Sequence, residues 1–91
     1  MTVRVMNPRK IIYETAQGIC AVLPVVGEQL SVKDFHQPMV AALGGGMMFV
    51  EHAESSSSAT AEFLISGGLA AMSHDNVLTV FVEGGQAERG G

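Results

Sequence analysis

Short runs of apolar and β-branched residues, separated by turn residues, make up most of this chain. The first run, at residues 2–5, alternates in the way that suits a half-buried strand, and Asn7-Pro8 then supplies a turn signal. A helical period is not sustained anywhere, since the best candidate, at residues 40–43, is cut by three glycines before one turn is complete. The pattern therefore predicts an all-β chain.

Further runs predict strands separated by glycine-rich or polar turns. A polar, serine-rich segment at residues 54–58 indicates an exposed loop tip, and His74-Asp75-Asn76 indicates another turn. Because Gly44-Gly45-Gly46 permits a tight reversal, we expect the runs on either side of it to form a hairpin. The predicted strands lie near residues 2–6, 11–13, 18–26, 30–32, 38–43, 47–50, 60–66, 69–72 and 77–82.

This arrangement is typical of a small β-sandwich of roughly eight to ten short, mostly antiparallel strands. A length of 91 residues supports a single domain, since a second hydrophobic core could not be closed from what remains. We assign residues 1–83 to this domain and residues 84–91 to a flexible, glycine-rich tail.

Composition excludes several classes of function. The net charge of −4 argues against nucleic acid as a partner, because phosphates require a basic face. The single cysteine, Cys20, leaves no disulfide framework and no cysteine cluster for zinc. No apolar run reaches the roughly 18–20 residues of a membrane-spanning helix, and no secretory signal precedes the first strand. We therefore expect a protein on the cytoplasmic side of the membrane.

The candidate catalytic and metal-binding residues are poorly spaced. His36, His52 and His74 lie far apart in the sequence, and we interpret the last two as solvated at a strand end and a turn. Asp34 and His36, with a serine such as Ser31, have the composition of a hydrolase triad but lack a nucleophile elbow. The glycine triplet lacks the lysine and hydroxyl of a nucleotide loop. We expect no catalytic residue, metal, nucleotide site or cofactor.

Several short motifs occur along the chain in the same order as in one known family. They are the segment from Asn7 to Glu14, the pair Gly27-Glu28, the run His36-Gln37-Pro38-Met39-Val40-Ala41, the pair Gly67-Gly68, and Asp75-Asn76-Val77-Leu78-Thr79-Val80. Together they resemble the epsilon subunits of bacterial F-type ATP synthases over nearly the whole chain. The chain departs from the family between Glu28 and His36, where it is one residue longer, and at its end, where the family continues into a helical hairpin.

The resemblance implies a non-catalytic part of the rotor, coupling the gamma subunit to the c-ring of a proton- or sodium-translocating ATP synthase. Such a subunit is a peripheral component at the cytoplasmic face of the bacterial inner membrane. The resemblance implies that Glu28 faces the c-ring and that Asn7, His36 and Ala41 face gamma. Each residue also has a purely local interpretation: in the same order, these are a solvated loop acid, a turn cap, a histidine at the start of a strand and a core alanine. An apolar strip uncovered by the absent hairpin would drive self-association of the isolated domain.

Two other functions fit the same residues. A free-standing β-sandwich adaptor could use this scaffold for an unrelated partner, since fold does not determine function. A small enzyme or ligand-binding protein could use Asp34 and His36 in the mouth of a barrel. That second hypothesis requires the two side chains to converge on a pocket.

Overall fold

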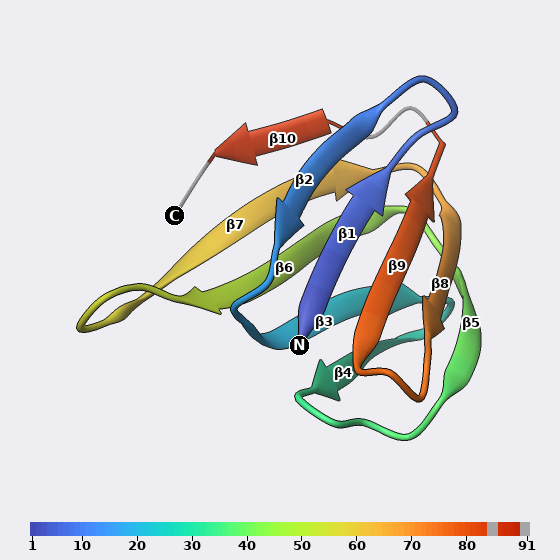
Figure 1. The fold of residues 1–91 in the computed structure, drawn as a ribbon. Helices are drawn as coiled ribbons and strands as arrows, with labels where there is room; N and C mark the ends of the chain where they lie inside the picture. The colour runs from blue at the N-terminus through green and yellow to red at the C-terminus, as the bar shows by residue number, and fades with distance from the viewer. Residues whose placement is uncertain (84–85, 90–91) are drawn as a thin grey trace.

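The computed structural model describes residues 1–83 and 86–89, and this part of the chain contains ten strands and no helix. The strands form one curled sheet in the order β10-β7-β6-β3-β5-β8-β9-β1-β2, with β4 paired to β3 (Figure 1). The all-β prediction is confirmed. The strands are β1 (Thr2–Met6), β2 (Ile11–Thr15), β3 (Gly18–Val25), β4 (Glu28–Lys33), β5 (Met39–Leu43), β6 (Gly46–Ala53), β7 (Ser58–Ile65), β8 (Gly68–Met72), β9 (Val77–Val82) and β10 (Gln86–Arg89).

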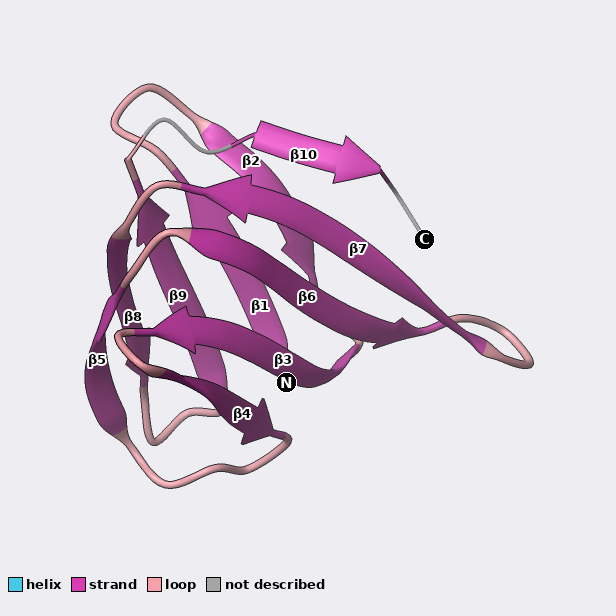
Figure 2. Ribbon diagram, turned by 180° about the vertical axis from the view of Figure 1, so that it is seen from behind, coloured by secondary structure: helices cyan, strands magenta, loops and turns pink. Residues whose placement is uncertain are grey.

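The curled sheet folds into two layers, as both ribbon views show (Figures 1 and 2). The β1 layer contains β2, β1, β9, β8 and β5, and the β6 layer contains β4, β3, β6, β7 and β10. Strands β3 and β5 connect the two layers into one sheet through a single ladder pair, Val25 with Leu43. Within the described chain β1 and β9 run parallel, and the other paired strands are antiparallel. This is the predicted small, mostly antiparallel β-sandwich.

The core lies between the two layers and follows from the alternation of the strands. In β7, Ala61, Phe63 and Ile65 point inward and are at most 3% exposed, whereas Leu64 points outward and is 52% exposed. No polar or charged side chain is buried in the part of the chain that the structure describes. The buried residues are Met1, Val3, Val5, Ala21, Leu23, Val32, Leu43, Met48, Val50, Ala61, Phe63, Ile65, Ala70, Met72, Leu78, Val80 and Val82.

The hairpin predicted around Gly44-Gly45-Gly46 is wrong. Strand β5 pairs with β8 in the β1 layer, whereas β6 pairs with β3 and β7 in the other layer. The glycines therefore carry the chain across from one layer to the other, and the amide of Gly44 donates a hydrogen bond to the carbonyl of Pro24 at 2.9 Å. The same backbone freedom that permits a reversal also permits this crossover.

The serine-rich tip is confirmed as an exposed turn, since β6 and β7 form a long hairpin closed by a hydrogen bond from Glu54 N to Ser57 O (Figure 2). The predicted tail, residues 84–91, includes β10, which pairs with β7; residues 84–85 and 90–91 lie outside the described residues, and the predicted boundary stays a prediction. The described residues contain no helix with the length and apolarity needed to cross a bilayer.

Candidate protein-interaction surface

A row of apolar side chains crosses the outer face of the β1 layer. The register pairs each member with the next, across the strands β5, β8, β9, β1 and β2. Leu69, Phe81 and Ile11 are 51%, 50% and 50% exposed, which is unusual for side chains of this size lying side by side. We call this set the apolar row; it consists of Ala42, Leu69, Phe81, Met6 and Ile11.

A second row runs beside it and changes from apolar to charged along its length. It begins with Val40, which is 75% exposed, and Ala71, its partner on β8. It continues through Thr79 and ends at Arg4, whose Nε donates a hydrogen bond to Glu14 Oε2 at 2.6 Å. The exposed apolar surface is thus bounded by an ion pair on the β1–β2 side, as the rim of a protein interface usually is.

Two shallow hollows lie on this outer face. The first has a volume of about 520 Å³ and is lined by Met6, Asn7, Pro8, Gly68, Leu69, Phe81, Val82 and Glu83. The second has a volume of about 500 Å³ and is lined by Pro38, Met39, Val40, Ala71, Met72, Ser73, Val77 and Thr79. Hollows flanked by exposed leucine, valine and phenylalanine are suited to receive side chains from a protein partner.

The residues expected to face gamma lie on or next to this surface. Asn7 lines the first hollow, and its Oδ1 accepts hydrogen bonds from the amides of Arg9 and Lys10 at 2.8 and 2.9 Å, so it also caps the turn. His36 is two residues before Pro38, which lines the second hollow. The Nδ1 atom of His36 lies 2.8 Å from the carbonyl oxygen of Gln37.

Ala41 has a different position from its neighbours on β5. It pairs with the fully buried Ala70, so its side chain shares the inner face of the β1 layer. Val40 and Ala42, on either side, point outward. A partner on the outer face would therefore contact these two residues directly, with Ala41 beneath them.

Glu28 lies on the other layer, where the β3–β4 hairpin turns. Gly27 adopts a positive φ of 84°, and Val26 beside it is 85% exposed. Glu28 is exposed at the start of β4, paired with Val25. The turn thus presents an apolar and an acidic side chain at the tip of the β3–β4 hairpin.

Asp34 and His36 are engaged by different partners. Asp34 Oδ1 accepts hydrogen bonds from the amine of Met1 and from Asn76, whereas the ring of His36 contacts the Gln37 carbonyl. Neither residue lines either of the two hollows. Within residues 1–83 and 86–89, no group of three or more His, Cys, Asp or Glu residues is placed to hold a metal ion.

The interpretation of His52 as a solvated residue is wrong. Its side chain is only 19% exposed, and its Nδ1 lies 2.8 Å from the hydroxyl of Tyr13, which belongs to the opposite layer. Tyr13 also meets Phe63 edge-on, with 5.2 Å between ring centroids, and burial raises the pKa of its phenol. The alternation of Met48, Val50 and His52 on β6 already pointed inward, which is the signal that sequence reasoning missed.

The fold recurs in chains of known ATP synthases. One structural neighbour comes from the central stalk and c-ring of the Tetrahymena thermophila mitochondrial ATP synthase, with a TM-score of 0.75 and 18% identity, covering 93% of this chain and 64% of that one. Another comes from the Euglena gracilis mitochondrial ATP synthase, with a TM-score of 0.79 and 16% identity, covering 93% and 51%. At these identities the likeness establishes the fold.

Sequence comparison gives a more specific likeness. No protein-family profile matches the chain. However, it is 34% identical over 86 residues to the ATP synthase epsilon chains of Nostoc sp. (strain PCC 7120) and Trichormus variabilis. The match covers 94% of this chain, which spans about 60% of the length of these curated relatives. The resemblance predicted from the motifs is therefore confirmed: over nearly its whole length, this chain is similar to ATP synthase epsilon chains.

Proposed function

We propose that this domain is a non-catalytic part of the central stalk of an F-type ATP synthase, coupling the gamma subunit to the c-ring. The observation that carries the proposal is the apolar row with its two hollows, found on a chain that is similar to ATP synthase epsilon chains. Torque passes between rotor components by contact, which requires no reactive group. In this proposal the domain is a peripheral part of a membrane-associated complex, and protons or sodium ions drive that complex.

The outer face of the β1 layer is the side that packs against gamma in this proposal. Burying exposed apolar side chains such as Leu69 and Phe81 against a partner stabilises the complex by about 25 cal/mol per Å² of apolar surface removed from water. The Arg4–Glu14 ion pair and Asn7 lie at the border of this face, where polar groups provide specificity without a large desolvation cost. His36 is two residues before Pro38, which lines the second hollow, and in this proposal it contributes at the same border.

The end of the sandwich formed by the β3–β4 turn faces the c-ring. Val26 and Glu28 project from the turn, and the crossover glycine Gly44 is hydrogen-bonded to Pro24 directly behind it. In this proposal the domain has two contact surfaces, the outer face of the β1 layer for gamma and the β3–β4 turn for the ring.

Replacing Leu69 by aspartate is expected to weaken binding to the gamma subunit roughly 30-fold, or about 2 kcal/mol. The substitution buries a carboxylate in the middle of the apolar row, between Ala42 and Phe81. The dissociation constant is measured by titrating the purified domain with the gamma subunit of the same organism. The folded state is verified separately by circular dichroism.

Leu64→Asp is the matched control. Leu64 is 52% exposed and Leu69 is 51% exposed, but Leu64 lies on the outer face of the opposite layer. The control should bind gamma like the original chain. Equal losses for the two variants would place the gamma contact elsewhere, and no binding by the original chain would favour the free-standing adaptor.

Exchanging Glu28 for lysine is expected to reduce coupling to the c-ring about two- to fivefold, the range for a single exposed charge. Glu28 is exposed, and no side chain or backbone group within residues 1–83 and 86–89 forms a hydrogen bond with its carboxylate. The melting temperature of the variant should therefore stay unchanged. Coupling is measured as ion pumping per ATP hydrolysed in vesicles containing the reconstituted complex. Asp75→Lys makes the same charge change on the exposed β8–β9 turn and should leave coupling intact; a variant of Glu28 that unfolds would contradict its placement on a free turn.

A further inference from the structure

Phe35 is an exposed aromatic residue in a backbone conformation that rarely suits it. It is the third residue of a four-residue turn at the end of β4, which is closed by a hydrogen bond from the amide of His36 to the carbonyl of Lys33 at 3.0 Å. Its φ is 61°, in the left-handed region, where turns usually carry glycine or asparagine. Phe35 is nevertheless 80% exposed, so burial of its ring does not compensate for the strain.

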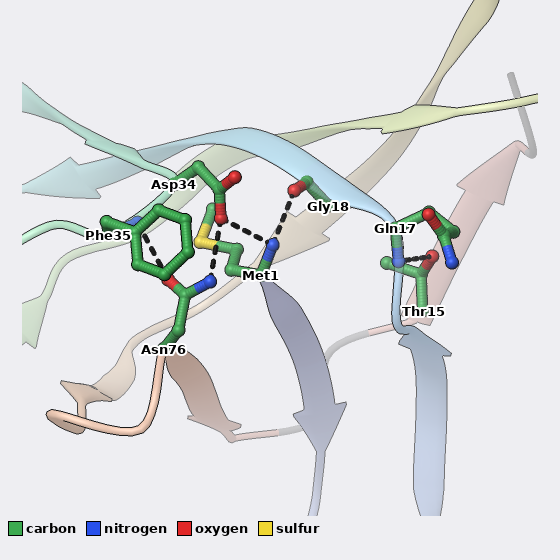
Figure 3. Close-up of polar contacts among 7 residues, drawn as sticks. All are labelled: Met1, Thr15, Gln17, Gly18, Asp34, Phe35 and Asn76. Carbon is green, nitrogen blue, oxygen red and sulfur yellow. Dashed lines mark hydrogen bonds and ion pairs between the residues drawn. The ribbon is translucent and has the colours of Figure 1, made fainter.

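The side chain of Asn76, on the β8–β9 turn, holds Phe35 in this conformation. Its Oδ1 accepts a hydrogen bond from the amide of Phe35 at 2.7 Å, and its Nδ2 donates one to Asp34 Oδ1 at 2.8 Å (Figure 3). One side-chain amide thus binds two consecutive residues of the turn, with its acceptor for the first bond and its donor for the second. We call these two bonds the Asn76 clamp; they join segments that are 41 and 42 residues apart in the sequence.

Asn76 is itself fixed by its backbone. Its amide donates to the carbonyl of Ser73 at 3.2 Å, and its carbonyl accepts a hydrogen bond from the amide of Thr2 at 3.1 Å. Its φ is 64°, and asparagine tolerates the left-handed region better than most residues that carry a Cβ. The Asn76 clamp is therefore anchored where β9 begins its pairing with β1.

The Asn76 clamp joins two segments that both line the second hollow on the outer face of the β1 layer. Ser73 and Val77 line this hollow from the turn that carries the clamp, and Pro38 lines it from the segment that follows Phe35. Aromatic residues are enriched in the cores of protein interfaces, and a segment already fixed in the free protein loses less conformational entropy on binding. An exposed aromatic residue with a fixed backbone, in the segment that leads to this hollow, has the properties of an interface contact.

We propose that Phe35 is a contact residue of the gamma-facing surface and that Asn76 is its positioning residue; this inference rests on the function proposed above. The ring of Phe35 is buried against gamma, and the Asn76 clamp keeps the turn in the conformation that presents the ring. The strain at Phe35 thereby has a function, because a glycine would suit the backbone but would remove the aromatic contact. The asparagine in the run Asp75-Asn76-Val77 also acquires a physical role.

Replacing Phe35 by glycine separates a contact role from a structural one. Glycine adopts the left-handed conformation without strain and keeps the amide that Asn76 binds, so the midpoint of urea unfolding should stay unchanged or rise. Binding to the gamma subunit of the same organism should nevertheless weaken about 10-fold, as for the loss of an aromatic contact. Val26→Gly is the matched control, because Val26 is 85% exposed on the β3–β4 turn and its loss should leave gamma binding unchanged.

Replacing Asn76 by glycine tests the clamp. This variant keeps the left-handed backbone of the β8–β9 turn but removes both side-chain bonds. Hydrogen exchange of the Phe35 amide, followed by NMR, should become about 5- to 10-fold faster, the scale of one lost hydrogen bond. The amide of Ser73, which bonds the Val77 carbonyl in the same turn, is the internal control and should keep its rate. The affinity for gamma should fall about 3- to 5-fold in the original chain and little further in Phe35→Gly, because Asn76 acts through Phe35.

Three outcomes would overturn this inference while Leu69→Asp still loses gamma binding, and they would leave the proposed function intact. An unchanged exchange rate at Phe35 in Asn76→Gly would show that the clamp does not hold the turn. Full gamma affinity of Phe35→Gly would show that the ring makes no contact, and a marked loss of stability in the same variant would assign the ring a structural role. If the original chain does not bind gamma, the proposed function fails and this inference fails with it.

Discussion

Replacing Phe63 by alanine should lower the free energy of unfolding by about 3–5 kcal/mol, the range for deleting a buried aromatic ring. Phe63 is 1% exposed, pairs with Met48 on β6 and meets Tyr13 of the opposite layer edge-on. Its removal leaves a cavity between the layers and withdraws the support of Tyr13, which bonds His52. Urea unfolding followed by circular dichroism measures the change.

Leu64→Ala is the matched control for Phe63, because it lies next to it on β7 and points to the outside. Its expected cost is within about 0.5 kcal/mol, as for most surface substitutions. A small domain has about 5–15 kcal/mol of stability in total, so the Phe63 variant should be partly unfolded at modest urea concentrations. Similar midpoints for the two variants would show that the layers do not pack through Phe63.

The positions of the strands could be predicted because each signal is local. Alternating residues in β7 and the β-branched run of β9 favour extended backbone whatever lies opposite them. The partner of each strand is not a local property. The glycines between β5 and β6 allow a hairpin and a crossover equally, and the choice is made by the burial of Leu43 and Met48 in different layers.

The interaction surface is less accessible to sequence reasoning for the same reason. Phe81 and Leu69 read as strand residues, and nothing nearby indicates that they point outward together. The proximity of Phe81 to Met6 requires the parallel pairing of β1 with β9, two strands that are distant in the sequence. The motifs drew attention to Asn7 and His36 at the border of this face, but the apolar row itself emerges only from the register.

The polar contacts show the limit most clearly. The Met1 amine, Asp34 and Asn76 are 33 residues or more apart along the chain where they bond, and no spacing motif describes them. Tyr13 and His52 are 39 residues apart and come from different layers. Such contacts depend on how the sandwich closes, so they follow from the tertiary fold and cannot precede it in an argument from sequence.

Gly68→Ala should destabilise the domain by about 2–6 kcal/mol, combining backbone strain with overpacking. Gly68 lies at φ 154°, between β5 and β9, and a Cβ there would be 2.0 Å from the carbonyl oxygen of Phe81. That contact is with backbone, which cannot rotate away as a side chain would, so β8 must separate from β9. The cost is measured by urea unfolding of the variant and the original chain.

Gly27→Ala distinguishes the two causes, because Gly27 also has a positive φ of 84° but nothing lies within 4 Å of a Cβ placed there. Backbone strain alone should cost about 1 kcal/mol at this open turn. The difference between the Gly68 and Gly27 variants therefore estimates the price of forcing a side chain between adjacent strands. If the two variants lose equal stability, the close approach of β8 to Phe81 is not a constraint, and the register that aligns Leu69 with Phe81 in the apolar row loses its physical basis.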